Sequence, residues 1–112
     1  MSVFSSVAAL EEAFPNHFAA PVEFREETTL ALDPARKAAL PAIALHLKEV
    51  LGFRFLLDLT TVDHLGEDPR FEAVYEFYSL EAGTHLRLKL RISEDDELFA
   101  LDGIQLVDHP LL

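Results

Sequence analysis

Hydrophobic residues near the start of the chain recur at intervals of three and four, the period of one helix face. They predict a helix over residues 3–14 with an apolar face of Val3, Val7, Leu10 and Phe14. A second helix should begin at Asp33-Pro34, a typical N-cap followed by a first-turn proline, and end at Gly52. Because Pro41 removes a helical hydrogen bond, we expect a break there and a main helix from Pro41 to Leu51.

Alternating hydrophobic and polar residues predict strands in much of the remaining chain. Two short strands joined by a polar turn are expected within residues 22–32, and three longer ones at residues 53–62, 70–79 and 85–92. The first long strand is hydrophobic at both sets of alternating positions: Phe53, Phe55, Leu57 and Leu59 in one set, Leu56 and Val62 in the other. This pattern is typical of a strand inside a sheet covered on both faces, so we expect it to be buried on both sides.

These elements predict one α+β domain over residues 1–112, built as a two-layer sandwich. Its order would be helix, two strands, helix, three strands, with two helices packed on a mixed sheet of about five strands. A chain of 112 residues, of which 50% are hydrophobic, can bury one core but not two. The residues after an acidic turn at 93–97 are mostly apolar and show no clear period.

The strand at residues 85–92 carries the clearest alternation and a stripe of basic side chains. Its inward set is Leu86, Leu88, Leu90 and Ile92, and its outward set is His85, Arg87, Lys89 and Arg91. The stripe fits either an edge strand protected by charge or a docking surface for an acidic partner. Tyr75 and Tyr78 lie on opposite faces of the preceding strand, so one belongs to the core and the other is available to a neighbouring protein. The predicted partner-interface residues are therefore His85, Arg87, Lys89, Arg91 and Tyr78.

The net charge of −11 narrows the classes of partner. An acidic chain repels phosphate backbones and anionic membrane surfaces, so we expect no nucleic-acid binding and no direct membrane insertion. A basic protein or a neighbouring subunit is compatible with this charge, which alternatively serves only solubility. No stretch is long and apolar enough to cross a bilayer, and residues 1–14 lack the basic region of a signal peptide. We therefore expect a cytoplasmic location.

The sequence offers little that could carry a reaction. It has no cysteine, which excludes disulfides, thiolate nucleophiles and cysteine-ligated metal clusters, and no glycine-rich phosphate-binding motif. Asp58, Asp63 and His64, with Asp68 nearby, could supply oxygen and imidazole ligands to a metal ion, but such residues are also ordinary in turns and at strand ends. We therefore predict no catalytic, cofactor-binding or metal-binding residues and no cofactor.

The central part of the chain carries two linked motifs. Residues 55–66 are FLLDLTTVDHLG, residues 70–80 are RFEAVYEFYSL, and the strand LRLKLRI follows at 86–92. Over roughly residues 40–96 this order resembles the C subunit, or 30 kDa subunit, of the proton-pumping NADH–quinone oxidoreductase known as respiratory complex I. A related protein of membrane-bound hydrogenases shares the pattern.

The resemblance implies a two-layer domain in a hydrophilic, cofactor-free scaffold subunit of the peripheral arm of that complex. Such a subunit has no activity alone. It packs chiefly against the large quinone-site subunit and is held on the cytoplasmic side of the inner membrane by its partners.

The resemblance weakens after the last predicted strand. There the family continues with a proline-rich turn, a tryptophan and a motif helix, whereas this chain has no tryptophan. We therefore expect a shortened or engineered member of the family, or a divergent paralogue with another role. The alternative is a free-standing interaction module that forms homodimers through a sheet edge or through the apolar C-terminal tail.

Overall fold

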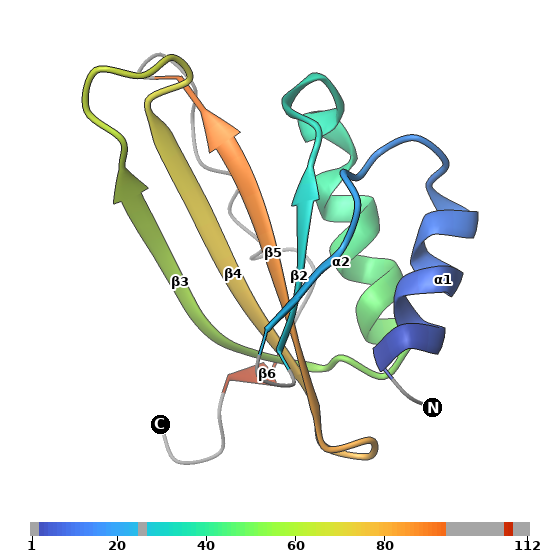
Figure 1. The fold of residues 1–112 in the computed structure, drawn as a ribbon. Coiled ribbons are helices and arrows are strands. Elements are labelled where there is room, and N and C mark those ends of the chain that lie inside the picture. The colour runs from blue at the N-terminus through green and yellow to red at the C-terminus, as the bar shows by residue number, and fades with distance from the viewer. Residues whose placement is uncertain (1–2, 25–26, 94–106, 109–112) are drawn as a thin grey trace.

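The structure, a computed structural model, describes residues 3–24, 27–93 and 107–108. Two helices, α1 (Val3–Ala13) and α2 (Leu40–Glu49), lie on one side of a six-stranded sheet (Figure 1). The strands are β1 (Val22–Phe24), β2 (Glu27–Leu32), β3 (Phe55–Asp63), β4 (Phe71–Ser79), β5 (Thr84–Ile92) and β6 (Val107–Asp108). This confirms the predicted two-layer α+β fold and its order of elements, to which the two-residue strand β6 is an addition.

The sheet is mixed, in the order β1-β2-β5-β4-β3-β6. The pairs β1–β2, β3–β4 and β4–β5 are antiparallel, whereas β2–β5 and β3–β6 are parallel. β5 lies between β2 and β4 in the middle of the sheet, so the interpretation of its basic stripe as protection of an edge strand is wrong.

The second helix begins in two stages, as the prolines predicted. Asp33 accepts a hydrogen bond from the Ala35 amide at 3.0 Å and caps a 3-10 helix over Pro34–Ala39. α2 then begins at Leu40, with Pro41 in its first turn, where the missing amide proton has no helical partner to lose. The predicted break is therefore a change of helix type immediately before the proline.

The hydrophobic core fills the space between the helices and the strands β2, β5 and β4. Across the sheet Leu30, Leu88 and Tyr75 occupy paired positions and are completely buried. Residues with the helical spacing cover them from the other layer: Val7, Leu10, Leu40, Ile43 and Leu47. The alternation read for β5 is confirmed, because Leu86, Leu88, Leu90 and Ile92 all belong to this core.

The prediction for β3 is wrong in two respects. A β-bulge between Leu56 and Asp58 shifts the register, so Phe55 pairs with Tyr78 while Leu59 pairs with Tyr75 on the opposite face of the sheet. Leu59 and Val62 are 41% and 42% exposed, so this strand is not covered on both faces by the described residues. The helices cover β2, β5 and β4; Leu56 near the start of β3 still packs against the core, whereas the rest of the strand from Asp58 onward is exposed (Figure 1).

The predictions for the acidic turn after Ile92 and for most of the apolar tail fall outside the described residues. Among the residues that are described, no helix has the length and apolar character needed to cross a membrane.

Candidate functional site

The face of the sheet opposite the helices carries the five residues that the sequence predicted as a partner interface. We call it the open face (Figure 1). Its side chains come from neighbouring strands whose registers place them in rows: Asp58, Thr60 and Val62 of β3; Glu72, Val74, Glu76 and Tyr78 of β4; His85, Arg87, Lys89 and Arg91 of β5. The five predicted interface residues, His85, Arg87, Lys89, Arg91 and Tyr78, are thus brought together on one surface.

Arg87 is held by two carboxylates from neighbouring strands. Its Nε donates to Glu76 Oε1 at 2.5 Å, and its Nη2 donates to Glu27 Oε2 at 3.2 Å. The hydrogen bond to Glu76 stabilises the charged guanidinium and raises the pKa of Arg87. The positive charge of this part of the stripe is therefore compensated within the chain.

The positive charges of Lys89 and Arg91 are also compensated within the chain. Lys89 Nζ lies 3.9 Å from Glu72 Oε1, and His64 Nε2 lies 3.4 Å from the same oxygen. The other ring nitrogen of His64 lies 3.5 Å from Glu67 Oε2. Arg91 donates to Glu67 Oε1 at 3.3 Å and to the Pro69 carbonyl oxygen. The stripe that looked in the sequence like a positive docking surface is a network of paired charges.

The turn between β3 and β4 closes one end of this network. Arg70 donates from Nε and Nη2 to the two oxygens of Asp63, at 2.7 and 2.8 Å, and the His64 amide donates to the Arg70 carbonyl at 2.8 Å. The hydrogen bond from Arg70 holds the pKa of the Asp63 carboxyl below its usual value. Asp63 therefore fixes a turn.

The alternative metal group of Asp58, Asp63 and His64, with Asp68, is not brought together. Asp63 is engaged by Arg70, and Asp58 lies five residues earlier in β3, where it pairs across the sheet with Glu76. Among the described residues no group of three or more His, Cys, Asp or Glu side chains could hold a metal ion. Asp63 and His64 stand at the end of β3 and at the start of the turn, whereas Asp58 lies within the strand.

Apolar side chains of β3 and β4 complete the open face. Val74, although it faces away from the helices, is only 7% exposed and does not belong to the main core. Tyr78 packs against His85, with ring centroids 4.7 Å apart, and Phe55 is its cross-strand partner. The prediction that one of the two tyrosines belongs to the core is confirmed for Tyr75, which is completely buried, whereas contact of Tyr78 with a neighbouring protein stays a prediction.

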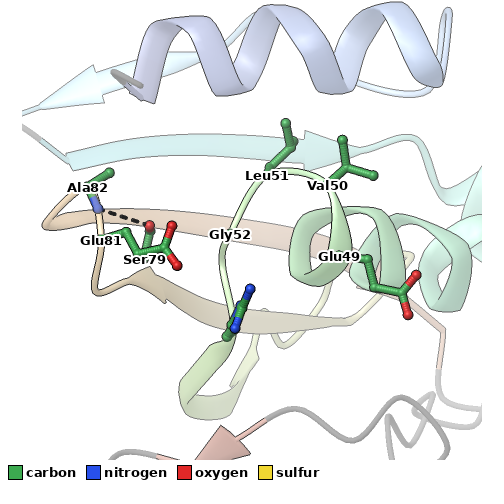
Figure 2. A pocket seen from close by; sticks show the side chains of 8 residues that line it. Glu49, Val50, Leu51, Gly52, Ser79, Glu81 and Ala82 are labelled. Carbon is green, nitrogen blue, oxygen red and sulfur yellow. Dashed lines mark hydrogen bonds between the residues drawn. The ribbon is translucent and has the colours of Figure 1, made fainter.

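A shallow depression of about 250 Å³ lies where the end of α2 meets the β4–β5 turn (Figure 2). Its lining residues are Glu49, Val50, Leu51, Gly52, Arg54, Ser79, Glu81 and Ala82. The Ala82 amide donates to Ser79 Oγ at 3.2 Å and shapes the turn that forms one wall. Two carboxylates and one guanidinium border the depression, so its charges favour no single class of ligand. No local motif in the sequence points to it, because its walls come from segments far apart in the chain.

Comparison with known proteins shows the family to which the chain is related. A model of the family described as respiratory-chain NADH dehydrogenase, 30 kDa subunit, matches residues 34–110. The chain belongs to this family. The resemblance seen in the two central motifs is thereby confirmed.

Curated relatives are C subunits of NADH-quinone oxidoreductases. That of Geotalea uraniireducens is 38% identical over 81% of this chain and 54% of its own length. That of Geobacter sulfurreducens is 32% identical over 94% of this chain and 75% of its own length. The chain spans about half the length of the first relatives that it matches, 54% and 55%.

Two solved structures share the fold. The trypsin-resistant fragment of Nqo5 matches with a TM-score of 0.62 and 20% identity, over 86% of this chain and 74% of that one. A chain of the archaeal membrane-bound sulfane sulfur reductase complex matches with a TM-score of 0.65 and 22% identity, over 85% of this chain and 52% of that one. The curated relatives are named as subunits, so the alternative of a free-standing homodimer gains no support.

Proposed function

We propose that this chain is a non-catalytic structural subunit of an NADH–quinone oxidoreductase of the complex I type. It would hold neighbouring subunits of the peripheral arm in place, chiefly the large quinone-site subunit, on the cytoplasmic side of the membrane. Membership of the 30 kDa subunit family supports the proposal. The single structural observation that carries it is the open face, which no described helix or strand covers.

The open face suits contact with a neighbouring subunit because the cations Arg87, Lys89 and Arg91 are already paired. Covering a lone cation with protein is costly, whereas an ion pair that is satisfied in advance carries its counter-charge into the interface. Arg87 and Lys89 bring Glu76 and Glu72 with them. Tyr78 and its cross-strand partner Phe55, both partly exposed, supply apolar contact area for such an interface. His85, Arg87, Lys89, Arg91 and Tyr78 are thus proposed as the interface residues.

Co-purification with the tagged large quinone-site subunit tests the proposal. Lys89→Glu places a new carboxylate beside Glu72, so both would have to lose water without a counter-charge when the face is covered. We expect this variant to fold and to lose at least tenfold in recovered partner. Arg36→Glu, the same charge change at an exposed position of the 3-10 helix, is the matched control and should co-purify normally.

Equal recovery with the two variants would refute the use of the open face. If the wild-type chain fails to associate with any peripheral-arm subunit of that complex, the proposed function itself is refuted. Circular dichroism of each variant separates loss of binding from loss of fold.

A further inference from the structure

β3 presents a second surface, its outer edge, which is distinct from the open face. In the described residues this edge pairs with another strand at only two positions, Phe55 with Val107 and Leu56 with Asp108 of β6. From residue 57 to residue 63 no described strand lies on that side, although β3 continues to Asp63 and remains paired with β4 on its other side. The backbone groups along this edge are those that a further strand would use.

The two edges of the sheet differ in how they are protected. At the opposite edge, β1 is three residues long, follows Pro21 and carries Glu23, which are common devices against unwanted strand pairing. β3 is nine residues long and contains no proline; its charged residues, Asp58 and Asp63, are both acidic, and its bulge lies before residue 58. Its outer half includes Thr60, Thr61 and Val62, residue types that favour strands. Beyond the bulge, residues 58–63 therefore form a longer edge than β1, and its carboxylates favour a basic added strand over an acidic one.

The charge of this edge indicates the chemistry of the added strand. Asp58 is exposed, makes no hydrogen bond or ion pair with a described residue, and lies directly across from Glu76. Glu76 already binds Arg87, so the row across the sheet has two adjacent carboxylates followed by one cation. Like charges directly opposite one another are unfavourable, and a cation on the far side of Asp58 would relieve the repulsion.

The exposed hydrophobic side chains of β3 indicate which other residue types the added strand would carry. Leu59 projects on the helix side of the sheet and Val62 on the open side, and they are 41% and 42% exposed. An added strand could cover Leu59 with apolar residues on one face while it presents basic and small polar residues near Asp58 on the other.

We propose that residues 58–63 of β3 bind an extended segment of a neighbouring protein by adding it to the sheet as a strand. The segment alternates basic or small polar side chains with β-branched apolar ones and places a basic side chain beside Asp58. Main-chain hydrogen bonds supply affinity in this mode, and the alternating side chains supply specificity. The inference rests on the proposed function, because a neighbouring subunit would supply the segment.

A synthetic peptide, KVTVKVTVK, is the probe, and amide hydrogen exchange read by NMR is the measurement. We expect the peptide to slow exchange at least tenfold at alternate amides within residues 58–63 and to leave β1 unchanged. The control peptide KVPVKVPVK has the same charge but cannot pair as a strand, and it should have no effect. Asp58→Asn should weaken binding of the first peptide about threefold or more, whereas Glu23→Gln on β1, the same neutralisation, should not.

Three results would overturn the inference. Equal protection by both peptides would mean that charge alone attracts them. Slow exchange, without peptide, of the same alternate amides, which point away from β4, would mean that the chain covers this edge itself, and protection that grows with protein concentration would mean that a second copy does. If the peptide fails but Lys89→Glu still abolishes co-purification, only the strand-addition inference falls. If the peptide binds but no peripheral-arm partner is recovered with the wild-type chain, the proposed function falls instead.

Discussion

Leu88 and Lys89 are adjacent on the central strand, and the structure places them in opposite environments. Leu88 is completely buried between Leu30 and Tyr75, whereas Lys89 lies on the open face, 3.9 Å from Glu72. Substituting either residue by glutamate introduces the same side chain on opposite faces of one strand. The pair therefore tests which face of β5 is buried, and the two changes should differ greatly in cost.

The expected loss of stability for Leu88→Glu is large. Losing the burial of one leucine side chain costs about 2–3 kcal/mol. Enclosing an unpaired carboxyl group adds roughly 1–3 kcal/mol even in its neutral form. A total near 5 kcal/mol is comparable with the whole stability of a small domain, about 5–15 kcal/mol. Lys89→Glu removes one long ion pair between partly exposed groups and should cost about 1 kcal/mol or less.

Urea unfolding at pH 7 and pH 4.5 measures both quantities. In Leu88→Glu, burial should raise the pKa of the introduced carboxyl in the folded state above its unfolded value of about 4.3. The variant is therefore least destabilised below the unfolded pKa, and it loses stability as the pH rises through the folded pKa. Similar losses for the two variants at pH 7, or a Leu88→Glu penalty that does not grow with pH, would show that the assigned faces are wrong.

Three further predictions concern the turn, the start of β3 and the open face. The Asp63 carboxyl should titrate by NMR below its unperturbed pKa of about 3.9 and return toward it in Arg70→Ala. Its contribution to stability should therefore be present above that value and be lost as the pH falls through the folded pKa; an unshifted titration would contradict the ion pair. Gly52→Ala should lower the free energy of unfolding by roughly 1–2 kcal/mol, because Gly52 has a φ of +80°, while a Cβ at this position would lie 3.7 Å from Ser79 Oγ and would not clash. No loss in urea unfolding would mean that the backbone there is not left-handed. A double-mutant cycle of Glu76→Gln and Arg87→Met should give a coupling of about 1 kcal/mol that shrinks in about 1 M salt, and zero coupling at low salt would refute the pairing.

Local sequence patterns were sufficient to predict the position and the buried face of a helix or strand that buries only one face. The period of the first helix predicted residues 3–14, and α1 covers Val3–Ala13. The alternation of β5 identified its buried leucines because each of them has a covered partner in β2 or β4. The proline rules located the change from the 3-10 helix to α2, since both prolines act on the backbone within one turn.

The errors arose where structure depends on residues distant in sequence. The bulge after Leu56 moves Phe55 and Leu59 to opposite faces, and nothing in the alternating pattern of hydrophobic residues reveals an extra residue in the strand. The charge of β5 was visible in the sequence, but its compensation was not. Arg87 pairs with Glu27, which is 60 positions earlier, and only the parallel pairing of β2 with β5 brings them together.

The distribution of burial connects the fold to the proposed role. The core lies between the helices and β2, β5 and β4, and β3 adds Leu56 to it, while residues 58–63 of β3 are exposed. β3 extends the sheet beyond the helices, and its exposed residues are available on both faces and along one edge. A neighbouring subunit that packs there would add burial to the part of the sheet that has least, and would leave the existing core contacts unchanged. Such docking requires no rearrangement of the core, which is the property expected of a structural subunit.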